Sequence, residues 1–445
     1  MTTDMTVGSP GKILWKFSIP LLVSILFQQL YSIADSIIAG KYINVDALAA
    51  VGASYPITMI FMAVAAGCNI GCSVVIGQLF GSRDHGGMKT AISTSIITVM
   101  AVSVVLTVVG LISCEPLLRL LDTPANIFDS SALFLRIYIF GLAFLFLYNI
   151  CTGVFTALGD SRTPLYFLIA SSVANICTAF FFVAKLNMGI AGVAWATFLC
   201  QGIAAILVVI TLLLRLRKIP TDGKYPRFSL FMLSRISAIS IPSILQQSFV
   251  SIGNLFVQGL VNSFGSDVVA GYSAAIKLNT FAVMGFTTLA TGVSTFTAQN
   301  LGAGKHKRIP QGFRSGCIMA ACVVIPFFIA FFFFGEQSMS IFMNNDGGSA
   351  AIAAGCSFLT IVSPFFFVVA LKLIADSVLR GAGSMRPFMI TTFADLIIRV
   401  ALSFVFSHFW GSVGIWLSWP VGWSIGCALS LIFYYSGVWK KEPLS

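Results

Sequence analysis

The sequence predicts an all-α polytopic membrane protein with 12 transmembrane helices in two homologous six-helix bundles. Three observations lead to this prediction: the composition, the number of long apolar runs, and an internal repeat. Of the 445 residues, 58% are hydrophobic and 9% are charged, whereas a soluble domain carries about 25% charged residues. A chain this apolar cannot cover itself with polar surface, so its solvent must be lipid.

Apolar runs long enough to cross a bilayer occur twelve times, since a span needs about 20 apolar residues. They cover residues 15–40, 50–79, 92–115, 132–157, 164–185, 190–214, 237–263, 270–299, 313–335, 352–379, 388–409 and 412–437. The longest polar connection lies at 215–235. It divides the chain into an N-terminal bundle, residues 1–214, and a C-terminal bundle, residues 236–445.

The distribution of basic residues predicts the orientation of these spans. Twelve spans place both termini on one side, and 19 of the 26 Lys and Arg residues fall on that side. Five fall on the other side, and two lie within spans. The positive-inside rule then predicts a multi-pass protein of the cell membrane with both termini and the 215–235 linker in the cytoplasm. The net charge of +11 lies in short connections, so nucleic acid is not an expected partner.

An internal repeat relates the two halves. The motif Gly71-x-Ser73-x4-Gln78-x2-Gly81 recurs as Gly292-x-Ser294-x4-Gln299-x2-Gly302, at an offset of 221. Shorter matches keep the same order at offsets of 219 to 224. Six spans is an even number, so the repeats have parallel topology and a pseudo-two-fold axis along the membrane normal. Such a duplication creates a central interface that can open to either side, which favours a transporter that works by alternating access.

Ionisable residues inside spans are candidates for function, because each costs about 2.5–3.5 kcal/mol on insertion scales. Asp35 lies in the middle of the first span, without a basic residue three or four positions away. Gln28 and Tyr31 precede it on the same helical face. A lone carboxylate here can bind and release a proton as its hydration changes, or hold Na⁺ among neutral oxygens. The alternative is a structural hydrogen bond to a neighbouring helix.

Two further groups of charges lie in the second half. Asp395 and Arg399 are four residues apart with the acid first, the favoured order for a helical pair, so we expect them to neutralise each other. Lys372 and Asp376 form a similar intramembrane pair.

The second half also has part of the polar helical face that Gln28, Tyr31 and Asp35 form in the first span. Asn254 occupies the position that corresponds to Asp35, and Gln247 lies seven residues before it. Both are candidate polar residues of a substrate cavity. The second half lacks the carboxylate, which places ion coupling in the first half.

Several classes of function are excluded by what the sequence lacks. It contains no G-x4-G-K-[S/T] phosphate loop, and its three His residues lie in connections or at a span end. No metal-ligand cluster is evident, apart from a possible Na⁺ site at Asp35. We therefore expect no enzymatic activity and no cofactor, and the energy for transport must come from an ion gradient.

A set of short motifs runs in order along the chain: Pro20, Gln28-Gln29-Leu30-Tyr31-x3-Asp35-x4-Gly40, Ala47-Leu48-Ala49-Ala50-Val51-Gly52, Gly159-Asp160-Ser161-Arg162-x-Pro164, Gly189-x2-Gly192-x2-Trp195-Ala196-Thr197, Leu379-Arg380-Gly381-x-Gly383, Asp395-x3-Arg399 and Trp419-Pro420-x2-Trp423. With these motifs the sequence resembles the multidrug and toxic compound extrusion (MATE) family of transporters. The resemblance covers essentially the whole chain, and the order and spacing of its motifs make it specific.

The resemblance implies two bundles arranged as a V that export cationic, often aromatic, drugs or metabolites against inward H⁺ or Na⁺. In the branch that this chain most resembles, the coupling site lies in the N-terminal bundle. The positions that match its ion-coupling and first-helix polar residues are Asp35, Asn175, Thr197, Gln28 and Tyr31.

The resemblance also implies a role for Pro20, near which protonation of the acid bends the first helix. A proline tolerated in a first helical turn is the alternative for Pro20. One departure from the family concerns the fifth-helix acid, which is Ala179 here. With one carboxylate fewer in this bundle, we favour H⁺ over Na⁺ as the coupling ion.

Other functions remain as alternatives to a cation-driven exporter of organic cations. A related flippase or exporter would carry a lipid-linked or sugar substrate, and its cavity should present Arg and Lys to phosphate. Lys372 and Arg399 are the only bases within spans, and both have acids nearby. An ion channel or a membrane enzyme would need a ring of like residues or clustered nucleophiles. We expect a monomer, since one chain with two bundles can work alone.

Overall fold

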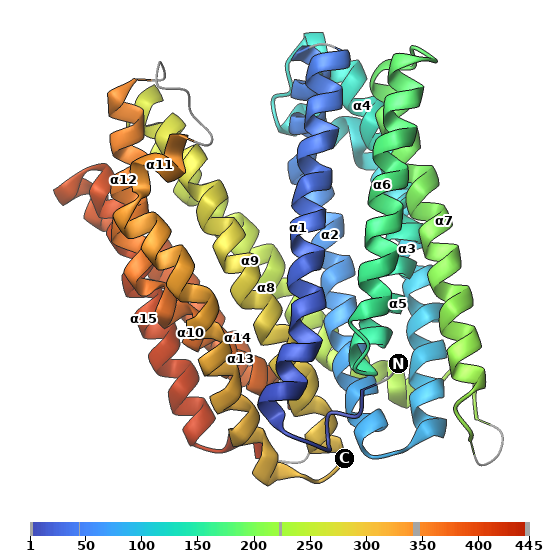
Figure 1. Ribbon diagram of the computed structural model, residues 1–445. Helices are drawn as coiled ribbons and strands as arrows, with labels where there is room; N and C mark the ends of the chain where they lie inside the picture. Colours follow the sequence, from blue (N-terminus) through green and yellow to red (C-terminus); the bar gives the residue numbers. More distant parts are fainter. Residues whose placement is uncertain (1–2, 44, 222–224, 341–347, 441–445) are drawn as a thin grey trace. The chain divides into compact units, whose positions relative to one another are not determined.

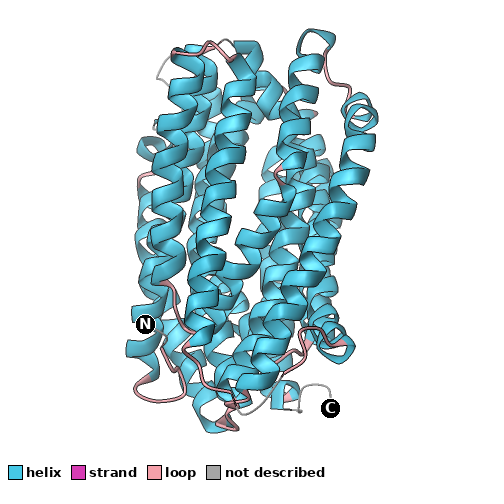
Figure 2. Cartoon of the chain, turned by 90° about the vertical axis from the view of Figure 1, so that its right-hand side faces the viewer, coloured by secondary structure: helices cyan, strands magenta, loops and turns pink. Residues whose placement is uncertain are grey.

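The protein is helical throughout the residues that the computed structural model describes, which are 3–43, 45–221, 225–340 and 348–440 (Figure 1). Figure 2 shows helices joined by short loops, and the described residues include no strand. The helices of the first half are α1 (Pro10–Tyr42), α2 (Val45–Gly81), α3 (His85–Leu120), α4 (Ala125–Phe140), α5 (Leu142–Ala157), α6 (Arg162–Ala184) and α7 (Gly189–Arg217).

The second half repeats this pattern with the short helix α11 and three short 3-10 helices added. Its helices are α8 (Leu230–Asn262), α9 (Ser266–Gly302), η1 (His306–Arg308), α10 (Ile309–Phe333), α11 (Gly335–Ser340), α12 (Ser349–Val362), η2 (Ser363–Phe365), α13 (Phe366–Gly381), α14 (Met385–Trp410), α15 (Ser412–Tyr435) and η3 (Val438–Lys440).

The predicted all-α membrane architecture is confirmed. Within the described residues, 11 helical segments are long and apolar enough to cross a membrane. A twelfth span is formed by α4 and α5 together, which are bent by 48° at their junction. Gly141 lies at this junction, where an added Cβ would lie 3.2 Å from the Tyr138 carbonyl oxygen. In the second half, η2 interrupts the corresponding span at Pro364.

The described chain divides into two compact units. Unit 1 contains residues 1–4 and Ile19–Ile244, and unit 2 contains Met5–Ser18 and Leu245–Ser445. The start of α1 therefore belongs to unit 2 and the start of α8 belongs to unit 1, an exchange across the predicted boundaries 1–214 and 236–445.

The repeated glycines explain how these exchanged helix starts pack. In unit 1, a Cβ added to Gly71 of α2 would lie 2.7 Å from the Ile236 carbonyl oxygen and 2.8 Å from the Ser240 nitrogen, both in α8. In unit 2, a Cβ on Gly292 of α9 would lie 2.7 Å from Ser18 Oγ in α1. Each glycine therefore lets one exchanged helix approach closely, and the two contacts are repeat counterparts.

Prolines lie beside the residues at which α1 and α8 change unit. Pro20 follows Ser18 by two residues, and Pro242 precedes Leu245 by three. A proline inside a helix removes one backbone hydrogen bond and favours a kink. The Ser24 hydroxyl donates to the Pro20 carbonyl oxygen at 2.9 Å, a local bond that also bends helices. Both sites suit a hinge on geometric grounds.

A buried carboxylate fixes the connection between α5 and α6. Asp160 is 2% exposed, and its Oδ1 accepts hydrogen bonds from the backbone nitrogens of Arg162 and Thr163, each at 3.1 Å. Its Oδ2 accepts from the Thr163 hydroxyl at 2.7 Å and pairs with Arg215 of α7. Burial alone raises the pKa of Asp160, but the bonds from Thr163 and the charge of Arg215 outweigh it, so the pKa lies below its ordinary value.

We expect the Asp160→Asn variant to be less stable than the wild type by about 1.5–3 kcal/mol at neutral pH, the range for a hydrogen-bonded charged group. A carboxyl with a lowered folded pKa stabilises the fold above its unfolded pKa of about 3.9, and this contribution is lost as the pH falls through the folded value. Thermal unfolding of both proteins between pH 8 and pH 3 tests this. The difference in midpoint should be constant down to about pH 5 and shrink at lower pH. A difference that persists unchanged at pH 3 would contradict it.

Candidate functional site

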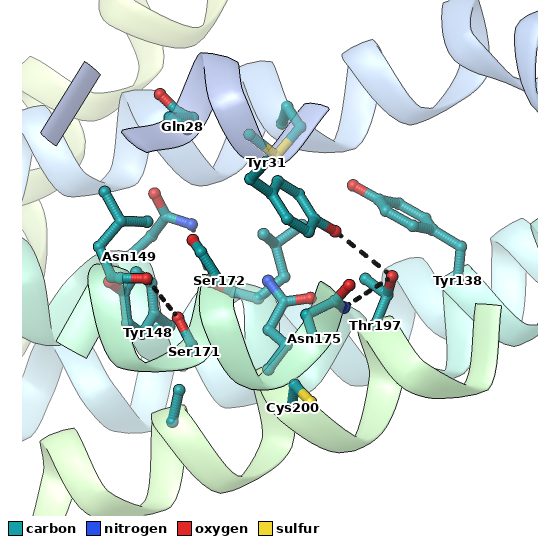
Figure 3. A pocket seen from close by; sticks show the side chains of 15 residues that line it. Gln28, Tyr31, Tyr138, Tyr148, Asn149, Ser171, Ser172, Asn175, Thr197 and Cys200 are labelled. Atoms are coloured by element: carbon teal, nitrogen blue, oxygen red, sulfur yellow. Dashed lines mark hydrogen bonds between the residues drawn. The ribbon is translucent and has the colours of Figure 1, made fainter. Parts of the chain in front are cut away.

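A cavity of about 260 Å³ lies within unit 1, among α1, α2, α4, α5, α6 and α7 (Figure 3). The surface of its wall is mainly apolar, but most of the side chains that line it carry a polar, uncharged group. The polar lining residues are Gln28, Tyr31, Tyr138, Tyr148, Asn149, Ser171, Ser172, Asn175, Thr197, Cys200 and Gln201. The described lining contains no Lys, Arg, Asp, Glu or His. Such a wall offers hydroxyl and amide groups, together with three aromatic rings, to a bound molecule.

One hydroxyl connects three helices at the edge of this cavity. Thr197 Oγ1 of α7 lies 3.2 Å from Asn175 Nδ2 of α6 and 3.4 Å from the Tyr31 hydroxyl of α1 (Figure 3). Thr197 donates its single proton to the Val193 carbonyl oxygen at 3.1 Å. It can therefore accept from Asn175 Nδ2, which is the donor of that bond, while in the contact with Tyr31 either hydroxyl could be the donor.

This proton count fixes the orientation of the Asn175 amide. Because the amide donates to Thr197, its oxygen Oδ1 points the other way. That oxygen is buried and has no hydrogen-bond partner within the part of the chain that the structure describes. A buried acceptor without a donor is costly, by about 1–3 kcal/mol. The site therefore suits a proton donor or a cation that approaches Asn175 Oδ1.

The α5 wall of the cavity is held by α2. Asn69 Nδ2 donates to the Asn149 carbonyl oxygen at 2.7 Å, and Asn149 Nδ2 donates to the Leu145 carbonyl oxygen at 2.8 Å. Gly153 allows this approach, since a Cβ there would lie 2.8 Å from Asn69 Oδ1. These contacts fix the part of α5 that presents Tyr148 and Asn149 to the cavity.

The structure brings together four of the five positions assigned to this site. Gln28 and Tyr31 of α1 line the cavity with Asn175 and Thr197. Asp35 lies in α1, but its side chain lies outside the described residues. Its role as the ion-coupling residue therefore remains a prediction.

The sequence-based assignment missed several lining residues, namely Tyr138, Tyr148, Asn149, Ser171, Ser172 and Gln201. A signal for some of them was present. Ser171, Ser172 and Asn175 recur at helical spacing in an apolar span, as do Thr197 and Gln201. Tyr138 reaches the cavity from the end of α4, next to the bend at Gly141, which the sequence pattern did not indicate.

The two polar residues expected in the second half lie on α8 in unit 2. Gln247 is half-buried and Asn254 is exposed. An apolar hollow lies on the same helix, lined by Ile252, Leu255, Phe256, Gly259, Leu260, Ser263 and Phe404, and neither Gln247 nor Asn254 is among these residues. Their assignment to a substrate cavity stays a prediction.

A buried ionic cluster in unit 2 contains the expected pair of Lys372 with Asp376 but not that of Asp395 with Arg399. Lys372 Nζ of α13 lies 3.0 Å from Asp376 Oδ2 and 3.4 Å from Asp395 Oδ2 of α14. Asp395 therefore pairs with Lys372, and the expected pair of Asp395 with Arg399 does not form. Helical spacing predicts charge pairs within one helix only, whereas the base that pairs with Asp395 is Lys372, on the other helix α13.

Arg399 instead lies over an aromatic ring. Its guanidinium carbon is 4.3 Å from the centroid of the Trp419 ring of α15, a cation–π contact. Arg399 Nε and Asp395 Oδ1 are both buried without a hydrogen-bond partner within the described residues. Gly422 lets α15 approach here, because a Cβ would lie 2.9 Å from both Asp395 Oδ1 and Arg399 Cβ.

Comparison with known proteins gives consistent matches over the whole chain. A family model described as MatE matches residues 20–181 and 242–405, one segment in each half. The probable multidrug resistance protein YoeA of Bacillus subtilis is 29% identical over 442 residues, covering 96% of this chain and 94% of that protein.

Two further comparisons extend this result. The probable multidrug resistance protein YpnP of Bacillus subtilis is 28% identical over 445 residues, covering 99% of this chain and 98% of that protein. Among solved structures, a MOP superfamily transporter from Pyrococcus furiosus has a TM-score of 0.92 at 21% identity, covering 99% of this chain and all of that one. The last comparison shows that the fold is shared.

Proposed function

The chain belongs to the MatE family of membrane transporters and is not an enzyme, and we propose that it is a proton-coupled antiporter that exports organic cations. Drugs or amphipathic metabolites of this class would leave the cell by alternating access. The curated relatives named above carry the description multidrug resistance protein. The observation that carries the proposal is the neutral, tyrosine-containing cavity of unit 1, with the unsatisfied Asn175 oxygen at its edge.

The wall of the cavity favours this substrate class. The faces of Tyr31, Tyr138 and Tyr148 attract a cationic or aromatic molecule through the negative potential of the rings. The absence of Lys and Arg from the described lining argues against a lipid-linked phosphate, which basic side chains would bind. We therefore prefer the exporter to the flippase.

The coupling ion in this proposal binds next to Asn175. Asp35 follows Tyr31 by four residues in α1, and Tyr31 contacts the same Thr197 hydroxyl as Asn175. A protonated carboxyl at Asp35 would supply a donor of the kind that Asn175 Oδ1 lacks. We propose that the loss of this proton weakens the link between α1 and the cavity, and that α1 then bends at Pro20.

The remaining parts of the proposal concern the oligomeric state, the membrane and the orientation of the protein. We propose that it acts as a monomer in the cell membrane, with both termini in the cytoplasm. The excess of Lys and Arg on the terminal side supports this orientation.

The experiment uses the purified full chain in liposomes. Efflux of a fluorescent organic cation is followed under a pH gradient, a Na⁺ gradient or neither, for wild type, Asp35→Asn and Asp46→Asn. Asp46 is an exposed aspartate at the start of α2 in the same unit, so Asp46→Asn is the matched control. We expect efflux to follow the pH gradient, to be lost in Asp35→Asn, and to be kept in Asp46→Asn.

Other outcomes would change specific parts of the proposal. Efflux that follows the Na⁺ gradient would keep the exporter and replace the coupling ion. Normal coupled efflux in Asp35→Asn would remove Asp35 from the coupling site. If the folded wild type carries no organic cation under any gradient, the exporter assignment is wrong and lipid-linked substrates become the leading alternative.

A further inference from the structure

The ionic cluster of unit 2 has the form of an occupied cation site. Lys372, Asp376 and Asp395 are 4%, 3% and 9% exposed, so the ammonium group lies among buried carboxylate oxygens. Asp376 Oδ1 accepts hydrogen bonds from the hydroxyls of Thr391 at 2.9 Å and Ser430 at 2.6 Å. These groups come from three helices, α13, α14 and α15; the two carboxylates contact the ammonium, and the two hydroxyls hold Asp376 from its other oxygen.

Lys372 is the base that pairs with both carboxylates of this cluster, whereas Arg399 contacts Trp419 rather than an acid. A further base, Arg380, follows Asp376 by one helical turn on α13 and acts electrostatically on it. Without the amine, Asp395 would lose the base that pairs with it in a low-dielectric interior. Buried uncompensated charge is strongly unfavourable, and carboxylate and hydroxyl oxygens are the ligands that hard cations prefer.

The internal repeat gives an independent reason to regard this place as a binding position. Left-handed glycines in the connections fix the register: Gly159 matches Gly383, with φ of 74° and 77°, and Gly189 matches Gly411, with φ of 57° and 58°. These pairs set offsets of 224 after α5 and 222 at the start of α7, and Pro164 matches Pro387 at 223.

This register relates the cluster of unit 2 to the cavity of unit 1. Lys372, Asp395, Gly422 and Gly426 then correspond to Tyr148, Ser172, Cys200 and Ala204, and all four of these line the cavity. Part of the same architectural position is therefore open in unit 1 and filled by ionised side chains in unit 2, whereas Asp376 and Ser430 correspond to Thr152 and Val208, which are not among the described lining residues. Gly426 leaves room for the Lys372 side chain, because a Cβ on Gly426 would lie 2.6 Å from Lys372 Cε.

We propose that this cluster is a cation-binding site of unit 2 whose occupant is the chain's own Lys372 ammonium, and that it binds a free monovalent cation when this amine is removed. The site binds ammonium and Na⁺ through Asp376 and Asp395, with Thr391 and Ser430 orienting Asp376. Because the occupant is covalently tethered, unit 2 needs no cation from solution. Together with the proposed function, on which this last step rests, the tethered ammonium confines the coupling ion to unit 1.

The test measures thermal unfolding of the purified full chain in detergent, at equal ionic strength, in choline chloride, sodium chloride or propylammonium chloride. The variant is Lys372→Ala, because propylammonium carries the three carbons and the amine that this substitution removes. The matched control is Lys277→Ala, which removes an exposed lysine from α9 in the same unit. The double variant Lys372→Ala/Asp395→Asn removes one charge of each sign.

We expect Lys372→Ala to unfold at a lower temperature in choline chloride and to recover in propylammonium chloride by on the order of 5 °C beyond any change in the wild type. Sodium chloride should give a smaller recovery, because Na⁺ cannot fill the space of the removed carbons. Lys277→Ala and the double variant should respond to the three cations as the wild type does.

Two results would overturn the proposal. One is a Lys372→Ala protein whose unfolding temperature is the same in all three salts. The other is a Lys372→Ala protein that none of the cations recovers in folded form, since a binding site should accept a free cation. Neither readout involves transport, so failure here is distinguishable from failure of the proposed antiport.

Discussion

Replacing Gly71 by Ala is expected to lower the free energy of unfolding by about 1–3 kcal/mol, the usual cost of overpacking a well-packed contact. Gly71 in α2 faces the start of α8, where an added Cβ would lie 2.7 Å from the Ile236 carbonyl oxygen and 2.8 Å from the Ser240 nitrogen. The Ser240 hydroxyl is nearer still and can rotate away, but the two backbone atoms cannot, so the helices must move apart. The midpoint of thermal unfolding in detergent measures the effect.

Two matched substitutions sharpen this prediction. Gly52 lies in the same helix and has no atom near an added Cβ, so Gly52→Ala should be neutral or slightly stabilising. Gly292→Ala, the repeat counterpart, meets the flexible Ser18 hydroxyl and should cost less than Gly71→Ala. Equal unfolding temperatures for Gly71→Ala and Gly52→Ala would show that the close approach of α2 and α8 is not required for stability.

The fold could be predicted almost entirely from the sequence, because lipid imposes a simple rule on it. Twelve apolar runs correspond to the eleven long helices and the bent pair α4–α5. The exact division of the chain into two units was harder to predict from the sequence. The start of α1 packs in unit 2 and the start of α8 in unit 1, an exchange that depends on tertiary contacts at Gly292 and Gly71. The glycines were visible as repeat motifs, but their partners were not.

The candidate site was predictable where polar residues interrupt an apolar helix. Gln28, Tyr31, Asn175 and Thr197 all line the cavity of unit 1. Tyr138 was not predictable, since the bend at Gly141 brings it there.

In unit 2 the expected pair of Lys372 with Asp376 is present, but the expected pair of Asp395 with Arg399 is not, for a related reason. Helical spacing favours Asp395 with Arg399, but it contains no information about Lys372 on the adjacent helix, which lies 3.4 Å from Asp395. A series of small residues on α15 did indicate that another helix packs closely against α15. Ser418, Gly422, Gly426 and Ser430 recur every four residues and are all buried, the small-xxx-small pattern of close helix packing in membranes.

Thr197→Val is expected to reduce gradient-driven efflux by about tenfold. Valine has nearly the shape of threonine but cannot accept a hydrogen bond, so Asn175 Nδ2 would lose its acceptor and the Tyr31 hydroxyl would lose its contact with Thr197. A buried donor left unmet costs about 1–3 kcal/mol, and about 1.4 kcal/mol corresponds to a factor of ten. We expect the loss of these bonds to lower efflux because they join α1, α6 and α7 around the cavity, and α1 carries Asp35.

Thr197→Ser separates this effect from a general loss of stability, since serine keeps the hydroxyl and removes only a methyl group. Efflux in liposomes under a pH gradient, compared at matched amounts of folded protein, should therefore be near wild type for serine and low for valine. A freed Asn175 amide can also rotate and present its nitrogen where Oδ1 now lies. That rotation would oppose a protonated donor at the same place, so the pH dependence of the remaining efflux should shift in the valine variant alone. Equal efflux and equal pH dependence in both variants would show that the Thr197 hydroxyl has no part in coupling.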